Sequence, residues 1–411
     1  MTAVPGTDAA SARRLMRPGE AFDTREHLAN EHRAALERGL DRMLVVDVDA
    51  HHFETESWSQ ISEYLEDDTI RHLDQAGRAG ALNGRATLLP VQSGNNQDVA
   101  GRITRHNLRR LEQVPADGVQ RDRVLLRRAM EAMCIDYQIV FPTPMLSLGL
   151  HPQPEIEVAV ARAYGRWMSE RVLAQEPTLR TMLYLPFSDP RASLALVEEF
   201  AGLPGVAGFM ITSTRYRAIT DEEYVPVYRA IEQSGMPLAF HSGYAWAGDR
   251  TMEMLNRFLS VHALGFVIHS MVHLTNWVIN GMPERFPALE VIWIESGVAW
   301  LPFLMQRLDN EYIMRSSEAP LLQRLPSEYI REMYYSTQPL EQTNMRALEL
   351  TFEMIDARRR LLYSSDYPHW DFDVPSRIYD LPFLDEETRA NILGRSAQRL
   401  FKLPDPPARA G

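Results

Sequence analysis

The chain has 411 residues, of which 45% are hydrophobic and 24% are charged, values that are ordinary for globular proteins. Its net charge of −12 argues against nucleic acid or an anionic membrane as a partner, because both are negatively charged. The single cysteine, Cys134, excludes an internal disulfide, and no stretch approaches the ~18 consecutive apolar residues of a membrane-spanning helix. These features predict a protein of the reducing cytoplasm.

The first predicted strand, Leu44–His51, carries the densest group of polar side chains in the sequence. It contains Asp47, Asp49 and His51, and His52 follows directly. Because a strand alternates its side chains between two faces, Asp47, Asp49 and His51 share one face. Carboxylates and imidazoles gathered this closely favour a divalent metal, because they are costly to bury together otherwise. A polar strand end with a hydrogen-bonded histidine is the alternative interpretation.

Seven further short runs rich in β-branched and aromatic residues follow along the chain, separated by helical patterns. These predicted strands are Tyr137–Thr143, Thr181–Pro186, Val206–Thr212, Pro237–His241, Leu289–Glu295, Met333–Ser336 and Leu361–Ser365. The predicted helices are Glu155–Gln175, Ala192–Ala201, Asp221–Gln233, Phe266–Asn280, Ala299–Arg315, Leu340–Ile355 and Glu386–Phe401. Eight strand–helix units predict an α/β fold, a (β/α)8 TIM barrel.

The barrel is predicted to span residues 44–403, with a long insertion at about 54–135 after the first strand. Residues 1–43 precede the barrel as a polar N-terminal helical arm, and residues 404–411 form a Pro-rich tail. The arm permits packing on the barrel or on a second chain. We therefore expect an oligomer, in which a paralogous subunit is one candidate partner.

Polar residues stand at the C-terminal ends of four of these strands, where TIM barrels place their chemistry. His51 ends the first predicted strand and His241 the fifth. Glu295 ends the sixth, and Asp366 follows the eighth. Chance could place one or two charged residues there, but four of metal-ligand type on one rim indicate a metal-dependent site.

Several motifs in this order resemble the amidohydrolase superfamily. The motifs are Asp47–His51, Phe240–Gly243, Pro283–Pro287, Ile294–Trp300, Ser364–Trp370 and Asn391–Gly394. They are typical of the amidohydrolase-related group that includes aminocarboxymuconate-semialdehyde decarboxylase and the resorcylate decarboxylases. The resemblance implies one metal ion with four protein ligands, Asp49, His51, His241 and Asp366. Asp366 is alternatively the proton acceptor for metal-bound water.

Three residues depart from that pattern. Glu295 stands where decarboxylases of the group more often show a histidine, His52 replaces a usual apolar residue, and His273 lies one helical turn after His269. They raise the candidate set to about seven ligands, too many for one ion, so we predict a second ion held by His52, His273 and Glu295. The alternatives are a strand-end hydrogen bond for His52 and a supporting role behind the ligands for His273. The predicted catalytic residues are Glu295, Asp366 and His273.

Ligand type leaves several functions open. Imidazole and carboxylate ligands without a thiolate suit Zn, Fe or Mn. The chain is similar to the branch of the superfamily whose dinuclear monooxygenase hydroxylates 2-aminoisobutyrate. Our first hypothesis is therefore an O2-dependent monooxygenase with two ions, Fe and Mn, that hydroxylates a small amino acid or carboxylate. The alternative is a mononuclear Zn or Mn hydrolase, or a non-oxidative decarboxylase of a small carboxylate. A third hypothesis is a catalytically inactive paralogue that serves as a structural subunit. The complete ligand set argues against it, because such a chain should have lost one or more of Asp49, His51, His241 and Asp366.

Overall fold

The computed structural model describes residues 22–80, 88–89, 109–110, 113–114, 121–214, 217–243, 255 and 257–406. The start of the predicted arm, much of the predicted insertion and the end of the predicted tail lie outside these residues. Among the described helices, none combines the length and the apolar character needed to cross a membrane. A short strand, β1 (Phe22–Asp23), runs parallel to β3 (Arg109–Arg110) as a separate pair.

Eight parallel strands form one sheet, which confirms the predicted barrel. In sheet order they are β2 (Val46–His52), β4 (Tyr137–Pro142), β5 (Leu179–Tyr184), β6 (Val206–Ile211), β7 (Leu238–His241), β8 (Val291–Ile294), β9 (Tyr334–Ser336) and β10 (Leu361–Leu362). Each predicted strand therefore has a counterpart, and each lies beside the next in the chain. That order brings the C-terminal ends of all eight strands to one rim.

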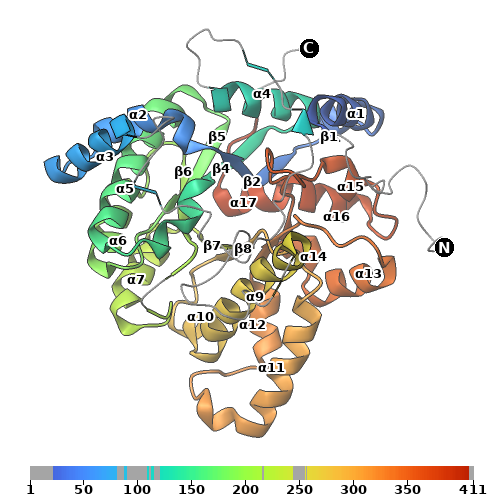
Figure 1. Cartoon of the computed structure of the whole chain (residues 1–411). Coiled ribbons are helices and arrows are strands. Elements are labelled where there is room, and N and C mark those ends of the chain that lie inside the picture. Colours follow the sequence, from blue (N-terminus) through green and yellow to red (C-terminus); the bar gives the residue numbers. More distant parts are fainter. Residues whose placement is uncertain are drawn as a thin grey trace.

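Helices surround the strands, and α11 projects furthest from them at the bottom of the view (Figure 1). The helices are α1 (Thr24–Glu37), α2 (Trp58–Ile61), α3 (Asp68–Gly80), α4 (Arg121–Met133), α5 (Pro154–Trp167), α6 (Pro190–Phe200), α7 (Val225–Ser234), α9 (Phe258–Ile279), α10 (Met282–Arg285), α11 (Leu301–Arg315), α12 (Pro326–Glu332), α13 (Met345–Met354), α14 (Ala357–Arg360), α15 (Pro375–Tyr379), α16 (Glu386–Ala390) and α17 (Ser396–Phe401).

The last predicted helix is not continuous. A π-helical segment, Asn391–Arg395, separates α16 from α17. Gly394 lies within it, and a Cβ atom there would clash with the carbonyl oxygen of Leu44. The segment therefore packs directly on the backbone that leads into β2, a close approach that only glycine permits.

The first and last strands of the sheet close the barrel through a seam. The backbone N–H of Val48 donates to the carbonyl of Tyr363 at 3.0 Å, and that of Asp366 donates to the carbonyl of Asp49 at 2.7 Å. Ala50 also forms an isolated parallel bridge with Tyr367. Because β10 is two residues long, these contacts continue the seam beyond the strand itself.

A buried carboxylate, Asp47, strengthens the seam. Its Oδ1 accepts the N–H of Ser365 at 2.8 Å, and its Oδ2 accepts the Ser365 hydroxyl at 2.6 Å. Gln138 of β4 donates to Oδ2 at 3.0 Å, and the N–H of Asp49 donates to Oδ1 at 3.2 Å. Burial raises the pKa of Asp47 to about 7, although these donors act in the opposite direction. Asp47 therefore joins β2, β4 and the end of β10.

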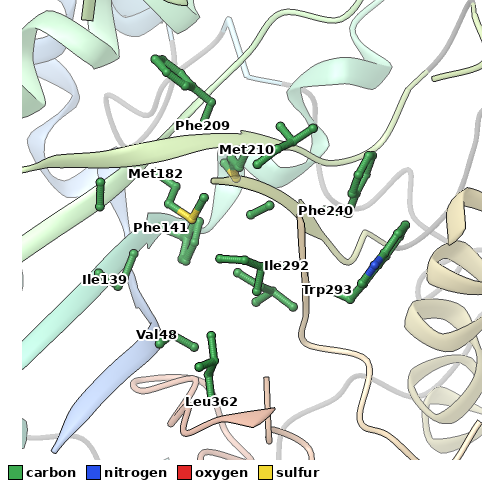
Figure 2. Packing of buried hydrophobic residues seen from close by; sticks show 14 of the residues in the cluster. Val48, Ile139, Phe141, Met182, Phe209, Met210, Phe240, Ile292, Trp293 and Leu362 are labelled. Atoms are coloured by element: carbon green, nitrogen blue, oxygen red, sulfur yellow. The ribbon is translucent and has the colours of Figure 1, made fainter. Parts of the chain in front are cut away.

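Apolar side chains fill the space between the strands and the helices. Phe240 of β7 stacks on Trp293 of β8 with ring centroids 4.5 Å apart (Figure 2). Trp277 of α9 meets the same ring edge-on at 5.4 Å. Burying each such side chain contributes about 1.5–3 kcal/mol. Phe240 thus faces α9, and strand alternation turns its neighbour His241 to the other side of the sheet.

Glu157 of α5 is a second buried carboxyl group with a perturbed pKa. Burial raises its pKa from 4.5 to about 7. The hydroxyl of Tyr184 donates to Oε1 at 2.6 Å, and the hydroxyl of Ser188 donates to Oε2. The folded protein therefore binds the carboxyl proton of Glu157 more tightly than the unfolded chain does. Protonation of Glu157 adds to the free energy of unfolding. This contribution is complete below about pH 4.5 and is lost as the pH rises through about 7.

Glu157→Gln tests this linkage, because glutamine keeps an acceptor for Tyr184 and a donor to the hydroxyl of Ser188 without the charge. Between about pH 4.5 and about pH 8, we expect the wild type to lose about 3 kcal/mol more unfolding free energy than the variant. Urea unfolding at both pH values measures the difference. Identical pH dependence in the two proteins would show that Glu157 does not titrate in this range.

Candidate metal site

Two histidines and an aspartate meet at the C-terminal ends of β2 and β7. Nε2 of His51 and Nε2 of His241 lie 3.3 Å apart. Oδ1 of Asp49 is 3.2 Å from the first nitrogen and 3.4 Å from the second. All three side chains are buried. With Glu295 they form a group whose ligand atoms lie within 4.8 Å of one another.

Hydrogen bonding determines which ring nitrogen of His241 carries the proton. Nδ1 lies 3.0 Å from the carbonyl oxygen of Ser242, which can only accept, so Nδ1 donates. A neutral imidazole has one N–H, and Nε2 therefore presents a lone pair to His51 and Asp49. Neither oxygen of Asp49 accepts a hydrogen bond within the described part of the chain. A cation between these groups relieves their repulsion, so the donor set fits a divalent metal ion.

Two further carboxylates come from residues immediately beyond strand ends. Glu295 follows β8 and Asp366 lies beyond β10, with backbone φ angles of 62° and 61°. Oδ1 of Asp366 is 3.3 Å from Nε2 of His51, and Oε2 of Glu295 is 3.6 Å from Nδ1 of His241. Such left-handed backbone costs about 1–3 kcal/mol per residue and is concentrated at functional sites. Burial raises the pKa of Asp366 well above its usual value, and the charges of Glu295 and Asp49 add to the shift.

His369 belongs to the site, although the sequence analysis gave it no role. Its Nδ1 is 2.6 Å from Oδ1 of Asp366, and its Nε2 is 3.1 Å from Oγ1 of Thr143. The ring stacks on His51 with centroids 4.3 Å apart. His51, Asp366 and His369 form the second group of convergent ligand atoms among the described residues. Its place three residues after Asp366, in the motif Ser364–Trp370, was the available signal.

His52 points away from the convergent atoms. Neighbouring strand residues face opposite sides, so His52 faces the helices where His51 faces the site. Nε2 of His52 lies 2.8 Å from the hydroxyl of Tyr164, and its ring stacks on Trp167 of α5 at 5.8 Å. Burial lowers the pKa of His52 to about 3. This geometry corresponds to the strand-end hydrogen bond, not to the predicted metal ligand.

His273 also lies apart from both groups of convergent atoms. Its ring stacks on Phe240 at 6.0 Å and meets His269 edge-on at 4.5 Å. Because Phe240 and His241 face opposite sides of β7, His273 occupies the helix side of the sheet. Of the three residues predicted for a second ion, Glu295 alone joins a convergent group in the described part of the chain. The structure therefore does not assemble the predicted second set.

Several curated proteins with sequences similar to this chain are decarboxylases. The γ-resorcylate decarboxylase of Polaromonas sp. (strain JS666) is 24% identical over 253 residues, which cover 59% of this chain and 76% of that protein. The γ-resorcylate decarboxylase of a Rhizobium sp. is 21% identical over 262 residues, covering 61% of this chain and 79% of that protein.

Solved structures show the same fold. The 5-carboxyvanillate decarboxylase of Sphingomonas paucimobilis has a TM-score of 0.64 at 20% identity, covering 88% of this chain and 100% of that chain. The dihydroxybenzoic acid decarboxylase of Polaromonas sp. JS666, with bound manganese and 2-nitroresorcinol, has a TM-score of 0.60 at 20% identity. That match covers 88% of this chain and 97% of the other.

These relatives overturn the first functional hypothesis. The predicted O2-dependent hydroxylation by an Fe/Mn monooxygenase is wrong, because the similar curated proteins are decarboxylases. The metal named in the similar structures described above is manganese, and iron finds no support among them. The similarity to the 2-aminoisobutyrate branch is not confirmed either.

The family assignment rests on most of the chain. The amidohydrolase model, Amidohydro_2, matches residues 46–403. This range contains the whole barrel and every member of the two convergent groups. The chain belongs to the amidohydrolase family.

Proposed function

We propose that the protein is a metal-dependent, non-oxidative decarboxylase of a small aromatic carboxylate. The observation that carries the proposal is the triangle of Nε2 of His51, Nε2 of His241 and Oδ1 of Asp49, whose sides measure 3.3, 3.2 and 3.4 Å. The proposed ligands of one divalent ion are Asp49, His51, His241 and Asp366, with Glu295 beside them. Manganese is favoured because a similar decarboxylase structure contains it. When bound, the cation supplies positive charge that holds and polarises the oxygens of the substrate.

Decarboxylation of an aromatic ring needs a proton donor beside the substrate. The C–CO2 bond breaks, its electron pair stays on the ring carbon, and a proton replaces the carbon dioxide. We assign the proton transfer to the pair Asp366 and His369: Nδ1–H of His369 lies 2.6 Å from Oδ1 of Asp366, so the carboxylate takes this proton and passes it to the ring carbon. Solvent then restores the proton to His369.

Glu295 gives this site a distinct preference. A carboxylate at this position adds negative charge to a site that already contains Asp49 and Asp366, so it disfavours a second anionic group on the substrate. It accepts a hydrogen bond from a neutral hydroxyl instead. We therefore propose a hydroxybenzoate with a single carboxylate as the substrate class. Glu295 takes the place of the histidine that the group more often shows.

Two sequence predictions complete the proposal. A cytoplasmic location agrees with the single cysteine, Cys134, which is buried at the end of α4. An oligomer, with a paralogous chain as one candidate partner, stays a prediction, and helix α1 of the arm packs on the barrel, where Glu31 accepts the hydroxyl of Ser376 at 2.5 Å.

Metal titration tests the proposed ligands. We expect the wild type to bind one Mn²⁺ per chain and His241→Ala to weaken binding by more than about 100-fold, because a ligand is lost. His273→Phe keeps a ring against Phe240 and should change the affinity by less than about threefold. Isothermal titration calorimetry measures both. Two ions per chain, or an equal loss in the two variants, would contradict the one-ion site.

Activity measurements test the reaction. The Mn²⁺-loaded enzyme should release CO2 from at least one member of a hydroxybenzoate panel, and chelation should abolish the release. Asp366→Asn should lower kcat by about 10²–10⁴-fold, because the proton donor is lost. Glu157→Gln, at a residue outside both groups of convergent atoms, is the control and should keep kcat. Hydrolysis of amide or lactone substrates without any CO2 release would replace this proposal with a hydrolase.

A further inference from the structure

A row of four side chains connects Asp366 with His51. Oδ1 of Asp366 is 2.6 Å from Nδ1 of His369. Nε2 of His369 is 3.1 Å from Oγ1 of Thr143, and the same oxygen is 3.4 Å from Nδ1 of His51. These residues come from β2, from the end of β4 and from the segment after β10. The row therefore begins and ends on proposed metal ligands.

The chemistry of the four groups gives the row one direction. Asp366 in its ligating, ionised form only accepts, so Nδ1 of His369 donates and its Nε2 is a bare acceptor. The hydroxyl of Thr143 therefore donates its hydrogen to Nε2 of His369. Its oxygen then accepts the N–H of His51, which must be on Nδ1. Nε2 of His51 is left with a lone pair, directed at Asp49 and His241.

The other tautomer of His51 would prevent the site from binding a cation. With the proton on Nε2, His51 would donate to Oδ1 of Asp49, which lies 3.2 Å away. That hydrogen bond would occupy both a nitrogen and an oxygen that the cation needs. We infer that Thr143 and His369 are positioning residues that hold His51 in the Nδ1–H tautomer and orient Asp366. This inference rests on the proposed metal site.

The backbone of Thr143 is held independently of its hydroxyl. Its N–H lies 3.0 Å from the carbonyl of His52 and 3.1 Å from Oε2 of Glu54. His369 likewise has a second anchor, since its ring stacks on His51. Side-chain substitutions can therefore remove the hydrogen bonds of the row while the surrounding backbone keeps its contacts.

Thr143→Val and Thr143→Ser form a matched pair, because valine keeps the shape and serine keeps the hydroxyl. We expect Thr143→Val to weaken Mn²⁺ binding by about 10–100-fold in calorimetry, and Thr143→Ser to stay within about threefold of the wild type. His369→Phe keeps the stacked ring and should lose about 10-fold or more, while His369→Asn retains a donor toward Asp366 and should recover part of the loss. Thermal unfolding confirms that each variant is folded.

Nitrogen-15 spectra of histidine-labelled, metal-free protein, recorded at a pH high enough to ionise Asp366, report the tautomer directly. We expect His51, identified by its absence from His51→Gln, to be protonated on Nδ1 in the wild type. In Thr143→Val it should gain protonation on Nε2, although the backbone of Pro142 still interacts with the ring of His51. An unchanged His51 pattern together with unchanged Mn²⁺ affinity in Thr143→Val would overturn the inference. Absence of Mn²⁺ binding in the wild type would refute the proposed metal site instead, and the spectra would still decide the tautomer.

Discussion

Closure of the barrel at Asp47 is the constraint on which the site depends. The strand that carries Asp49 and His51 and the segment that carries Asp366 belong to opposite ends of the chain, and β10 offers two residues of regular pairing. Asp47 spans this short seam by accepting donors from both sides. A buried carboxylate is costly unless its oxygens are satisfied, and here four donors satisfy them. The positions of Asp49, His51 and Asp366 thus depend on a residue that lies outside both groups of convergent atoms.

The alternation of side chains along the strands then separates chemistry from packing. On β2, His51 faces the convergent atoms and His52 packs on α5. On β7, His241 faces them and Phe240 packs on α9. One side of each strand end therefore collects charge and lone pairs, and the other collects aromatic rings. This division keeps the polar groups together without leaving a gap in the apolar layer.

The barrel could be predicted from the sequence because each strand is a short apolar run between helical patterns. The location of the site on one rim could be predicted because polar residues stand at the ends of those runs. Residue type alone does not say which way a side chain points, and the structure packs the rings of His52 and His273 on Trp167 and Phe240. Strand alternation already indicated the direction of His52, whereas the rotation of α9 that turns His273 toward Phe240 depends on tertiary packing. Thr143 and His369 are 226 positions apart, and no local pattern joins them. Ligand type also could not separate hydroxylation from decarboxylation, because both reactions use the same donors.

The left-handed backbone at Glu295 limits how this site can diversify. At a φ of 62°, glycine, asparagine, aspartate and histidine are accommodated most readily, whereas valine, isoleucine and threonine are strongly disfavoured. The histidine that the group more often shows is one of the accommodated residues. Substrate preference can therefore change by substitution among a few residue types at this position, without a change in the backbone at the strand end. Among the folded members of a library randomised at residue 295, glycine, asparagine, aspartate and histidine should be enriched over valine, isoleucine and threonine.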